Sequence, residues 1–492
     1  MIESPDNQQG PSVTRAWKPS LTGPLSQADL DRIVGQATEV LWEIGIACGH
    51  KPTVERLCSD RGIEYRGGRL RFRPARVYDL IESSRDKSRA AGQEPPTPRE
   101  LPEERFTLGG CWAGLFYCDP ETLRVRKATT AEARYMARFW DARDIAGVVP
   151  LVPGDVPPVL VSLASERIAL EESRKLGGLL TVLDPEEIRY LIEMNLAAGR
   201  RYQMLQQISI SPLRFNDEGL EAALQFLGRS DVDVHLAGPI PMAGATCPIE
   251  PRAALVQSLA EELGFCVARE VLTGSRGIGI ARVEHFDLQY GSIVFGSPEW
   301  CLYRAMILQA YEYLTGAPVR WGMFRSVAKQ PDEQAACERT ASVLWQALLG
   351  ARHFGAAGQL SVDEVFSPQQ VVIDEEILRY VERLVGGLPV VADAGDVLAL
   401  IREGVAENGF AGLPSTAGTF RHFCWFPSLF RHWNVSRWQT EGAPSVLSVA
   451  WDRVKERAAQ SKHRLGEEAL RAVESIYSKA AARFASATHG LV

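Results

Sequence analysis

Between about residues 136 and 385, the chain alternates short, continuous apolar runs with longer amphipathic stretches. Continuous apolar runs are typical of strands buried on both faces, and strands that alternate with helices predict a parallel sheet covered by helices. Eight such strands in about 240 residues match the size of a (β/α)8 (TIM) barrel. A doubly wound open sheet is the alternative. The expected strands are residues 147–153, 177–183, 205–212, 232–239, 276–283, 317–324, 351–357 and 370–374.

The flanking segments have other patterns. Residues 25–45 keep apolar side chains at helical spacing, with Ser26 as an expected N-cap and Asp29 three residues later. Residues 63–72 and 106–128 predict hairpins or short sheets. We therefore expect four regions in this α/β chain: a flexible N-terminal arm (1–24), an N-terminal extension of helices and β-hairpins (25–135), the barrel (136–385) and a C-terminal helical region (386–492).

Composition narrows the function classes. The net charge is −7 and no basic stripe occurs, which disfavours nucleic acid as a partner. No apolar run of about 18 residues occurs, so we expect no membrane span. The first residues do not resemble a signal peptide, and the nine scattered cysteines suit reduced thiols, so we expect a cytoplasmic protein. No spacing typical of zinc ligands occurs, and we expect no metal site.

The most distinctive segment is residues 238–251, Gly-Pro-Ile-Pro-Met-Ala-Gly-Ala-Thr-Cys-Pro-Ile-Glu-Pro. It follows the apolar run 232–237 and leads into an expected helix near Arg252. Small residues allow the backbone to approach a flat, bulky ligand closely, and the prolines restrict the loop to few conformations. A tight turn that touches no ligand is the structural alternative.

Several segments in order along the chain resemble the trimethylamine methyltransferase family. They are Gly45-Ile46 after the first helix, the loop above, and residues 152–158, 211–214, 294–299, 366–374 and 419–430. The resemblance implies a TIM barrel that moves a methyl group from a methylated amine to the cobalt of cobalamin, with the corrinoid carried by a separate small protein. The founding members use pyrrolysine and trimethylamine. This chain has only standard residues, so it resembles the branch that acts on quaternary amines such as glycine betaine.

A quaternary ammonium is held best by aromatic faces, and barrel active sites lie at the carboxyl ends of strands. The aromatic candidates at expected strand ends are Trp321, Phe324, His353 and Phe354, with Trp112, Phe116 and Tyr117 on the hairpin before the barrel. For a substrate carboxylate, the candidates are Arg320, Arg325 and Arg352. Asp155 could line the site or cap a helix. Ordinary core packing or surface ion pairs are the alternatives for each of these side chains.

For the corrinoid, the family resemblance points to the loop residues Pro241, Met242, Ala243, Gly244 and Thr246. Two departures from the family pattern concern the substrate: residues 414–419 lack the two histidines common there, and residues 111–118 are rich in aromatic side chains. Two other functions therefore stay open, namely a protein that binds methylated amines or a partner without catalysis, and a barrel enzyme with another cofactor. The aromatic stretch 425–438 predicts either a contact between copies of the chain or a buried helix pair.

Overall fold

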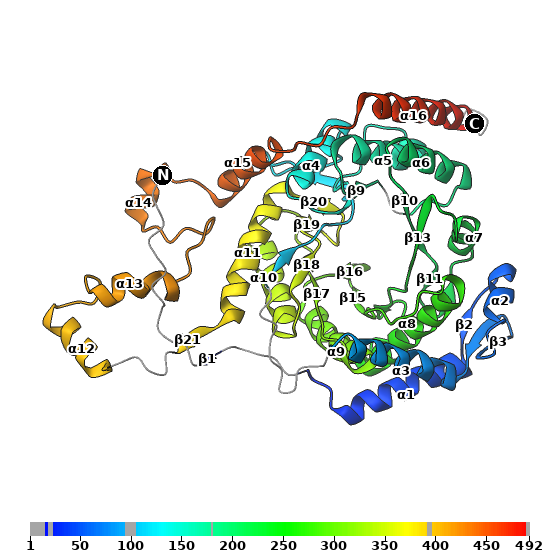
Figure 1. Ribbon diagram of the computed structural model, residues 1–492, viewed down its shortest axis with the longest axis horizontal. Coiled ribbons are helices and arrows are strands. Elements are labelled where there is room, and N and C mark those ends of the chain that lie inside the picture. Colours follow the sequence, from blue (N-terminus) through cyan, green and yellow to red (C-terminus); the bar gives the residue numbers. More distant parts are fainter. Residues whose placement is uncertain (1–14, 18–22, 94–104, 179–180, 391–395, 489–492) are drawn as a thin grey trace.

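The computed structural model describes residues 15–17, 23–93, 105–178, 181–390 and 396–488, and its fold is mixed α/β with short strands and longer helices (Figure 1). Helix α1 (Gln27–Glu43) begins as the sequence predicts: the Ser26 hydroxyl accepts from the Asp29 backbone N–H at 3.2 Å, and the Asp29 carboxylate accepts from the Ser26 N–H at 3.0 Å. The apolar side of α1 packs against α8 (Pro251–Thr273), within one core cluster.

A small sheet lies beside these helices. Strands β3 (Ile63–Arg66) and β4 (Arg69–Phe72) form the expected hairpin, and Gly67 and Gly68 turn it with φ angles of +62° and +77°. The sheet order is β11-β12-β2-β4-β3. The remaining elements of this part are β2 (Ile46–Ala47), α2 (Lys51–Leu57), α3 (Pro74–Ala90), β11 (Ser209–Ile210) and β12 (Arg214–Phe215).

Parallel strands follow along the chain, as the apolar runs predict. The parallel pairs are β8 (Gly147–Val148) with β9 (Leu176–Gly177), β10 (Tyr202–Gln207) with β13 (Val232–Ala237), β14 (Met242–Ala243) with β15 (Glu284–Asp287), and β17 (Trp321–Met323) with β18 (His353–Gly355). The helices that alternate with these strands, the first of them ahead of β8, are α4 (Thr130–Ala142), α5 (Val161–Glu172), α6 (Pro185–Ala197), α7 (Asp217–Phe226), α8, α9 (Pro298–Thr315), α10 (Glu333–Leu348) and α11 (Pro368–Gly386). Figure 1 shows α4 to α11 arranged as a ring around the strands. A 3-10 turn, Pro158–Leu160, precedes α5.

Two of the expected strands are wrong. Residues 370–374 lie inside α11, because Pro368 opens that helix and the Ser367 hydroxyl caps it by accepting from the Gln370 N–H at 3.3 Å. Residues 276–283 have no strand pairing, and β15 begins only at Glu284. The strand beside β18 is instead β5 (Thr107–Leu108), which the sequence placed in the N-terminal extension.

The second expected hairpin is present as β6 (Phe116–Cys118) and β7 (Val125–Arg126), which pair antiparallel. Strand β6 also pairs parallel with β20 (Val365–Phe366), whose hairpin partner is β19 (Gln359–Leu360). Strand β16 (Ser292–Val294) pairs antiparallel with β15. Through β6, the hairpin therefore pairs with β20, in the segment that precedes α11.

The C-terminal region is helical, as predicted. Helices α12 (Val397–Ala406), α13 (Pro414–Phe423) and α14 (Val435–Thr440) lie outside the ring (Figure 1). Helix α15 (Val446–Ala458) packs on α4 and α11, and α16 (Glu467–Thr488) packs on α5 and α6.

Part of the expected flexible N-terminal arm is a strand, because β1 (Arg15–Trp17) pairs antiparallel with β21 (Leu388–Val390). Residues 1–14 and 18–22 of that arm lie outside the described residues. Among the helices of the described ranges, none is both long and apolar enough to cross a membrane.

Candidate functional site

A cavity of about 340 Å³ lies inside the ring and combines aromatic and cationic side chains. Its tryptophans are Trp112 from the loop after β5, Trp300 from α9 and Trp321 from β17. Trp112 is 42% exposed and Trp321 62% exposed, so both leave ring surface for a ligand. The Trp321 ring also contacts His353, with 5.1 Å between the ring centroids. The cavity therefore offers indole faces, the surfaces that attract a cation most strongly.

Three guanidinium groups and one carboxylate line the same cavity: Arg282, Arg304, Arg325 and Glu284. The Trp300 Nε1–H donates to Glu284 Oε2 at 2.7 Å and fixes that carboxylate. Burial lowers the pKa of Arg304 to about 10, which still leaves it protonated at neutral pH. The lining thus carries an excess of positive charge beside its aromatic faces.

Arg325 is held by several neighbouring side chains. It is 7% exposed, its Nη1 pairs with Asp363, and its guanidinium lies 4.1 Å from the ring centroid of Phe295. Its Nε–H is buried and has no hydrogen-bond partner within the described part of the chain. Arg325 lines the cavity, and a guanidinium group there would stabilise a ligand carboxylate.

A second cavity, of about 460 Å³, adjoins the first because both are lined by Trp112, Met323 and Gly355. Its wall includes glycines where backbones pass closely: a Cβ on Gly110 would lie 2.4 Å from the Ala146 carbonyl oxygen. Lys175 and Arg200 add positive charge. The Cys111 thiol also lines it, and burial raises its pKa well above the usual value, so it stays protonated.

The loop 238–251 is connected to the first cavity through β15. The Pro241 carbonyl oxygen accepts from the Glu284 N–H at 2.9 Å, and Met242 pairs with Glu284. Within the loop, the Thr246 hydroxyl accepts from the Met242 N–H at 2.9 Å, and Gly244 has a φ of +93° that favours glycine. A rigid turn of small residues therefore stands next to the cavity wall, as its sequence predicts.

Apolar side chains are exposed around this loop. Ile240 and Ile249 belong to it, and Leu288 and Tyr290 lie at the tip of the β15–β16 hairpin. A Cβ built on Gly244 would lie 3.6 Å from Ile249 and 3.8 Å from Leu288, so these side chains gather over the glycine. The surface is a shallow apolar patch beside a cavity.

The structure brings some of the predicted residues together and separates others. Trp321 and Arg325 line the first cavity, and His353 contacts Trp321 while its Nδ1 lies 2.6 Å from the Thr107 hydroxyl. Phe324 and Phe354 are fully buried in the core, with ring centroids 6.2 Å apart, and line neither cavity.

The other predicted residues lie away from both cavity linings. Tyr117 is buried beneath the guanidinium of Arg126, 5.3 Å from its ring centroid. Asp155 accepts from the backbone N–H and hydroxyl of Thr130 at 2.8 and 2.7 Å, which holds the first turn of α4. The Arg320 backbone oxygen accepts from the backbone N–H of Arg352, linking the starts of two strands.

Sequence reasoning missed Arg282, Glu284, Trp300 and Arg304. Arg282 and Glu284 alternate along the segment that enters β15, and Trp300 and Arg304 occupy one face of α9 four residues apart. The i, i+4 spacing on α9 is the signal that could have revealed the second pair. Within the described ranges, no three His, Cys, Asp or Glu side chains gather as metal ligands would.

A family model described as trimethylamine methyltransferase (MTTB) matches residues 2–474 of the chain. The trimethylamine methyltransferase MttB of Methanosarcina barkeri is 31% identical over 220 residues, which cover 44% of this chain and 43% of that protein. MttB of Desulfitobacterium hafniense is 24% identical over 398 residues, covering 78% and 79% of the two chains. The chain thus matches less than half of the length of the Methanosarcina relative.

Proposed function

The chain belongs to the trimethylamine methyltransferase (MTTB) family, and from this premise we propose that it transfers a methyl group from a quaternary amine to the cobalt of a corrinoid carried by a separate protein. The substrate class is a betaine, a quaternary amine that also has a carboxylate, with glycine betaine as the simplest case. The observation that carries this choice is the cavity of about 340 Å³ in which tryptophan faces and guanidinium groups occur together.

The two ends of a betaine match the two kinds of lining. The trimethylammonium group would lie against Trp112 and Trp321, where each aromatic face contributes about 0.5–2 kcal/mol. The carboxylate would lie against the guanidinium groups of Arg282, Arg304 and Arg325, all of which line the cavity. Trimethylamine lacks an anionic group and would leave these arginines unused.

The chemistry asks little more of the protein than binding and orientation. When bound, the corrinoid supplies the cobalt centre that accepts the methyl group. The methyl–nitrogen bond breaks with its electron pair left on nitrogen, so the quaternary ammonium becomes a neutral tertiary amine and needs no proton. Accordingly, the protein's part is to hold the substrate in one orientation. The Cys111 thiol, kept protonated by burial, takes no part in this proposal.

The residues around the loop fit a corrinoid. Pro241, Met242, Ala243, Gly244 and Thr246 would face the macrocycle, since a flat apolar ring suits a surface of small residues. The exposed apolar side chains that gather over Gly244 extend that surface. The hydrogen bond between Pro241 and Glu284, a residue of the cavity lining, supports a corrinoid at this surface.

The proposal includes a (β/α)8 barrel as the complete fold. Strand β18 pairs with both β17 and β5, and Gly110 accepts from the Ala356 N–H at 2.9 Å along the same edge. Val149 donates to the Gly177 oxygen at 3.0 Å, which continues the parallel order. The helices α4 to α11 each follow one strand region, as the barrel requires. The first barrel strand would then be β5, ahead of the boundary at residue 136 that the sequence suggested.

A spectral assay tests the function. The purified protein is mixed with reduced cobalamin and, one at a time, glycine betaine, carnitine, proline betaine, choline and trimethylamine. We expect the absorbance change that accompanies methylation of cobalt with a betaine, and a slower change or none with choline and trimethylamine. Methylation with trimethylamine alone would contradict the substrate class. Binding of a betaine without methylation, even with corrinoid proteins added, would favour a non-catalytic role.

A further inference from the structure

The C-terminal arm, residues 396–440, lies outside the ring and buries little of its apolar surface (Figure 1). Helix α12 buries only Gly404, and α13 and α14 bury no residue. Its exposed large apolar side chains include Val405 at 70% and Val435 at 69%, together with Val397, Leu398, Leu400, Ile401, Phe410, Phe426 and Trp438. Single chains seldom expose so many apolar side chains in one segment, so the arm has the character of a contact surface.

The arm is nevertheless attached to α11 through residues 423–429. The Glu376 carboxylate on α11 accepts from the backbone N–H groups of Ser428 and Leu429 at 2.6 and 2.9 Å. Arg383 donates to the Phe423 carbonyl at 2.6 Å. Helices of ten residues or fewer are marginal on their own in water. A surface that covers α12, α13 and α14 would therefore stabilise them.

The charge of the arm indicates what kind of surface would cover it. The whole arm, residues 396–440, carries a net charge of +1, because Asp396, Glu403 and Glu407 offset three of its four arginines. Its positive charge is concentrated in residues 408–440, which contain Arg421, Arg431 and Arg437 but no Asp or Glu. Two 408–440 segments facing each other would bring like charges together. An acidic surface with apolar side chains is the complementary partner.

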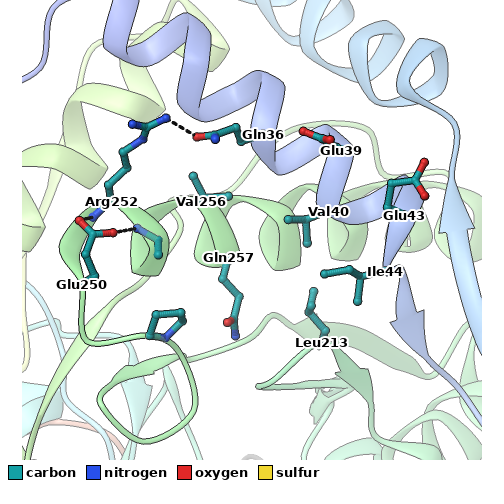
Figure 2. Close-up of a pocket in the computed structure, with 12 residues that line it drawn as sticks. Gln36, Glu39, Val40, Glu43, Ile44, Leu213, Glu250, Arg252, Val256 and Gln257 are labelled. Atoms are coloured by element: carbon teal, nitrogen blue, oxygen red, sulfur yellow. Dashed lines mark hydrogen bonds between the residues drawn. The ribbon is translucent and has the colours of Figure 1, made fainter.

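The chain itself has such a surface, a groove of about 660 Å³ between α1 and α8. Figure 2 shows Val40, Ile44, Leu213 and Val256 along the groove, with Glu39 and Glu43 at its edge on α1. Both glutamates are exposed, and neither has a cationic partner in the part of the chain that the structure describes.

Other charges at the groove are already engaged. The Glu250 carboxylate accepts from the backbone N–H groups of Arg252 and Ala253, and Arg252 donates to Gln36 at 2.7 Å (Figure 2). The unengaged charge at this groove is thus that of Glu39 and Glu43. Apolar side chains with a negative rim match residues 408–440 of the arm, which have exposed apolar side chains and positive charge.

We propose that the arm of one copy docks in the α1–α8 groove of a second copy. Two equivalent contacts related by a twofold axis then give a closed dimer. Each contact covers apolar arm side chains and places Arg421 and Arg431 near Glu39 and Glu43. Neither arginine has an acidic partner within the described residues.

Charge reversal on each side tests this arrangement by analytical ultracentrifugation. One variant carries Glu39→Lys and Glu43→Lys, and the other Arg421→Glu and Arg431→Glu. The wild type should sediment as a dimer, and each double variant should have a dimer dissociation constant at least ~10-fold higher. Mixing the two variants should restore a dimer, because each arm then meets a groove of opposite charge.

The control is Glu193→Lys with Glu456→Lys, the same charge change at exposed positions on α6 and α15, and it should sediment like the wild type. A wild type that is monomeric at micromolar concentration would overturn the proposal, and an acidic protein of another kind would then be the candidate cover. Dimers that withstand both reversals, or a mixture that stays monomeric, would overturn it equally.

Discussion

Trp321 offers the sharpest single test of the proposed ammonium site. The Trp321→Leu change removes the indole face but keeps an apolar side chain. Since Trp321 is 62% exposed and no hydrogen bond of its side chain occurs in the described structure, the change should leave the core intact. Its contact with His353, at 5.1 Å between centroids, is the ring interaction that would be lost.

The expected magnitude follows from the exposure of that ring. A cation over a tryptophan face gains about 0.5–1 kcal/mol at an exposed site and about 2 kcal/mol when the ligand is desolvated. These values correspond to roughly 2-fold to 30-fold in affinity. Because Trp321 lies in a cavity that a bound ligand would close, we expect the upper part of this range.

The assay is calorimetric titration with glycine betaine and with 3,3-dimethylbutanoate, which has the same carboxylate and a similar shape but no positive charge. Trp321→Leu should weaken betaine binding by the stated factor and dimethylbutanoate binding by less than ~2-fold. The matched Trp321→Phe variant should retain most of the betaine affinity. Equal losses for both ligands would refute a cation–aromatic contact, and unchanged binding of both would remove Trp321 from the site.

Three further predictions concern charged side chains. Arg325→Met should weaken the binding of carboxylated amines by about 10-fold or more without weakening choline binding, because the Asp363 carboxylate left unpaired does not repel a cation; titrations of both ligands would reveal this. Arg339→Met leaves the fully buried Asp374 carboxylate without its cationic partner. The free energy of unfolding in urea should therefore fall by about 3–5 kcal/mol, and a loss below about 1 kcal/mol would contradict that reasoning. Burial opposes ionisation of Glu375, but Arg143 and Arg457 outweigh it and hold its pKa below the usual value. Its stabilising contribution is therefore complete above the unfolded pKa of about 4.3 and lost as the pH falls below it, and Glu375→Gln should flatten the dependence of the urea midpoint on pH in that range.

The sequence predicted the alternation of strands and helices, because continuous apolar runs and capping signals are local. It failed where two local signals competed. Val371, Val372 and Ile373 are β-branched and suggested a strand, but Ser367 and Pro368 begin a helix just before them. A β-branched run inside a well-capped helix is buried by the tertiary fold regardless of its strand propensity.

The sequence predicted only some of the side chains that line the cavity, because successive residues of β17 face opposite sides of the sheet. Trp321 and Met323 line the cavity, whereas Phe324 packs in the core with Phe354. Successive side chains on a strand point to opposite faces. The sequence has aromatic residues at both odd and even positions here, so it does not indicate which of the two faces lines the cavity. The contribution of Arg304 from α9 depends on how that helix packs, which no local pattern records.

The most direct measurement follows the methyl group itself. Glycine betaine with deuterated methyl groups is incubated with the protein and reduced cobalamin, and both products are examined by mass spectrometry. We expect one deuterated methyl group on the cobalamin for each dimethylglycine formed, and much less of both products with the Trp321→Leu, Arg325→Met double variant. Label that remains on the betaine, with the protein folded and each candidate corrinoid protein supplied in turn, would contradict the proposed methyl transfer.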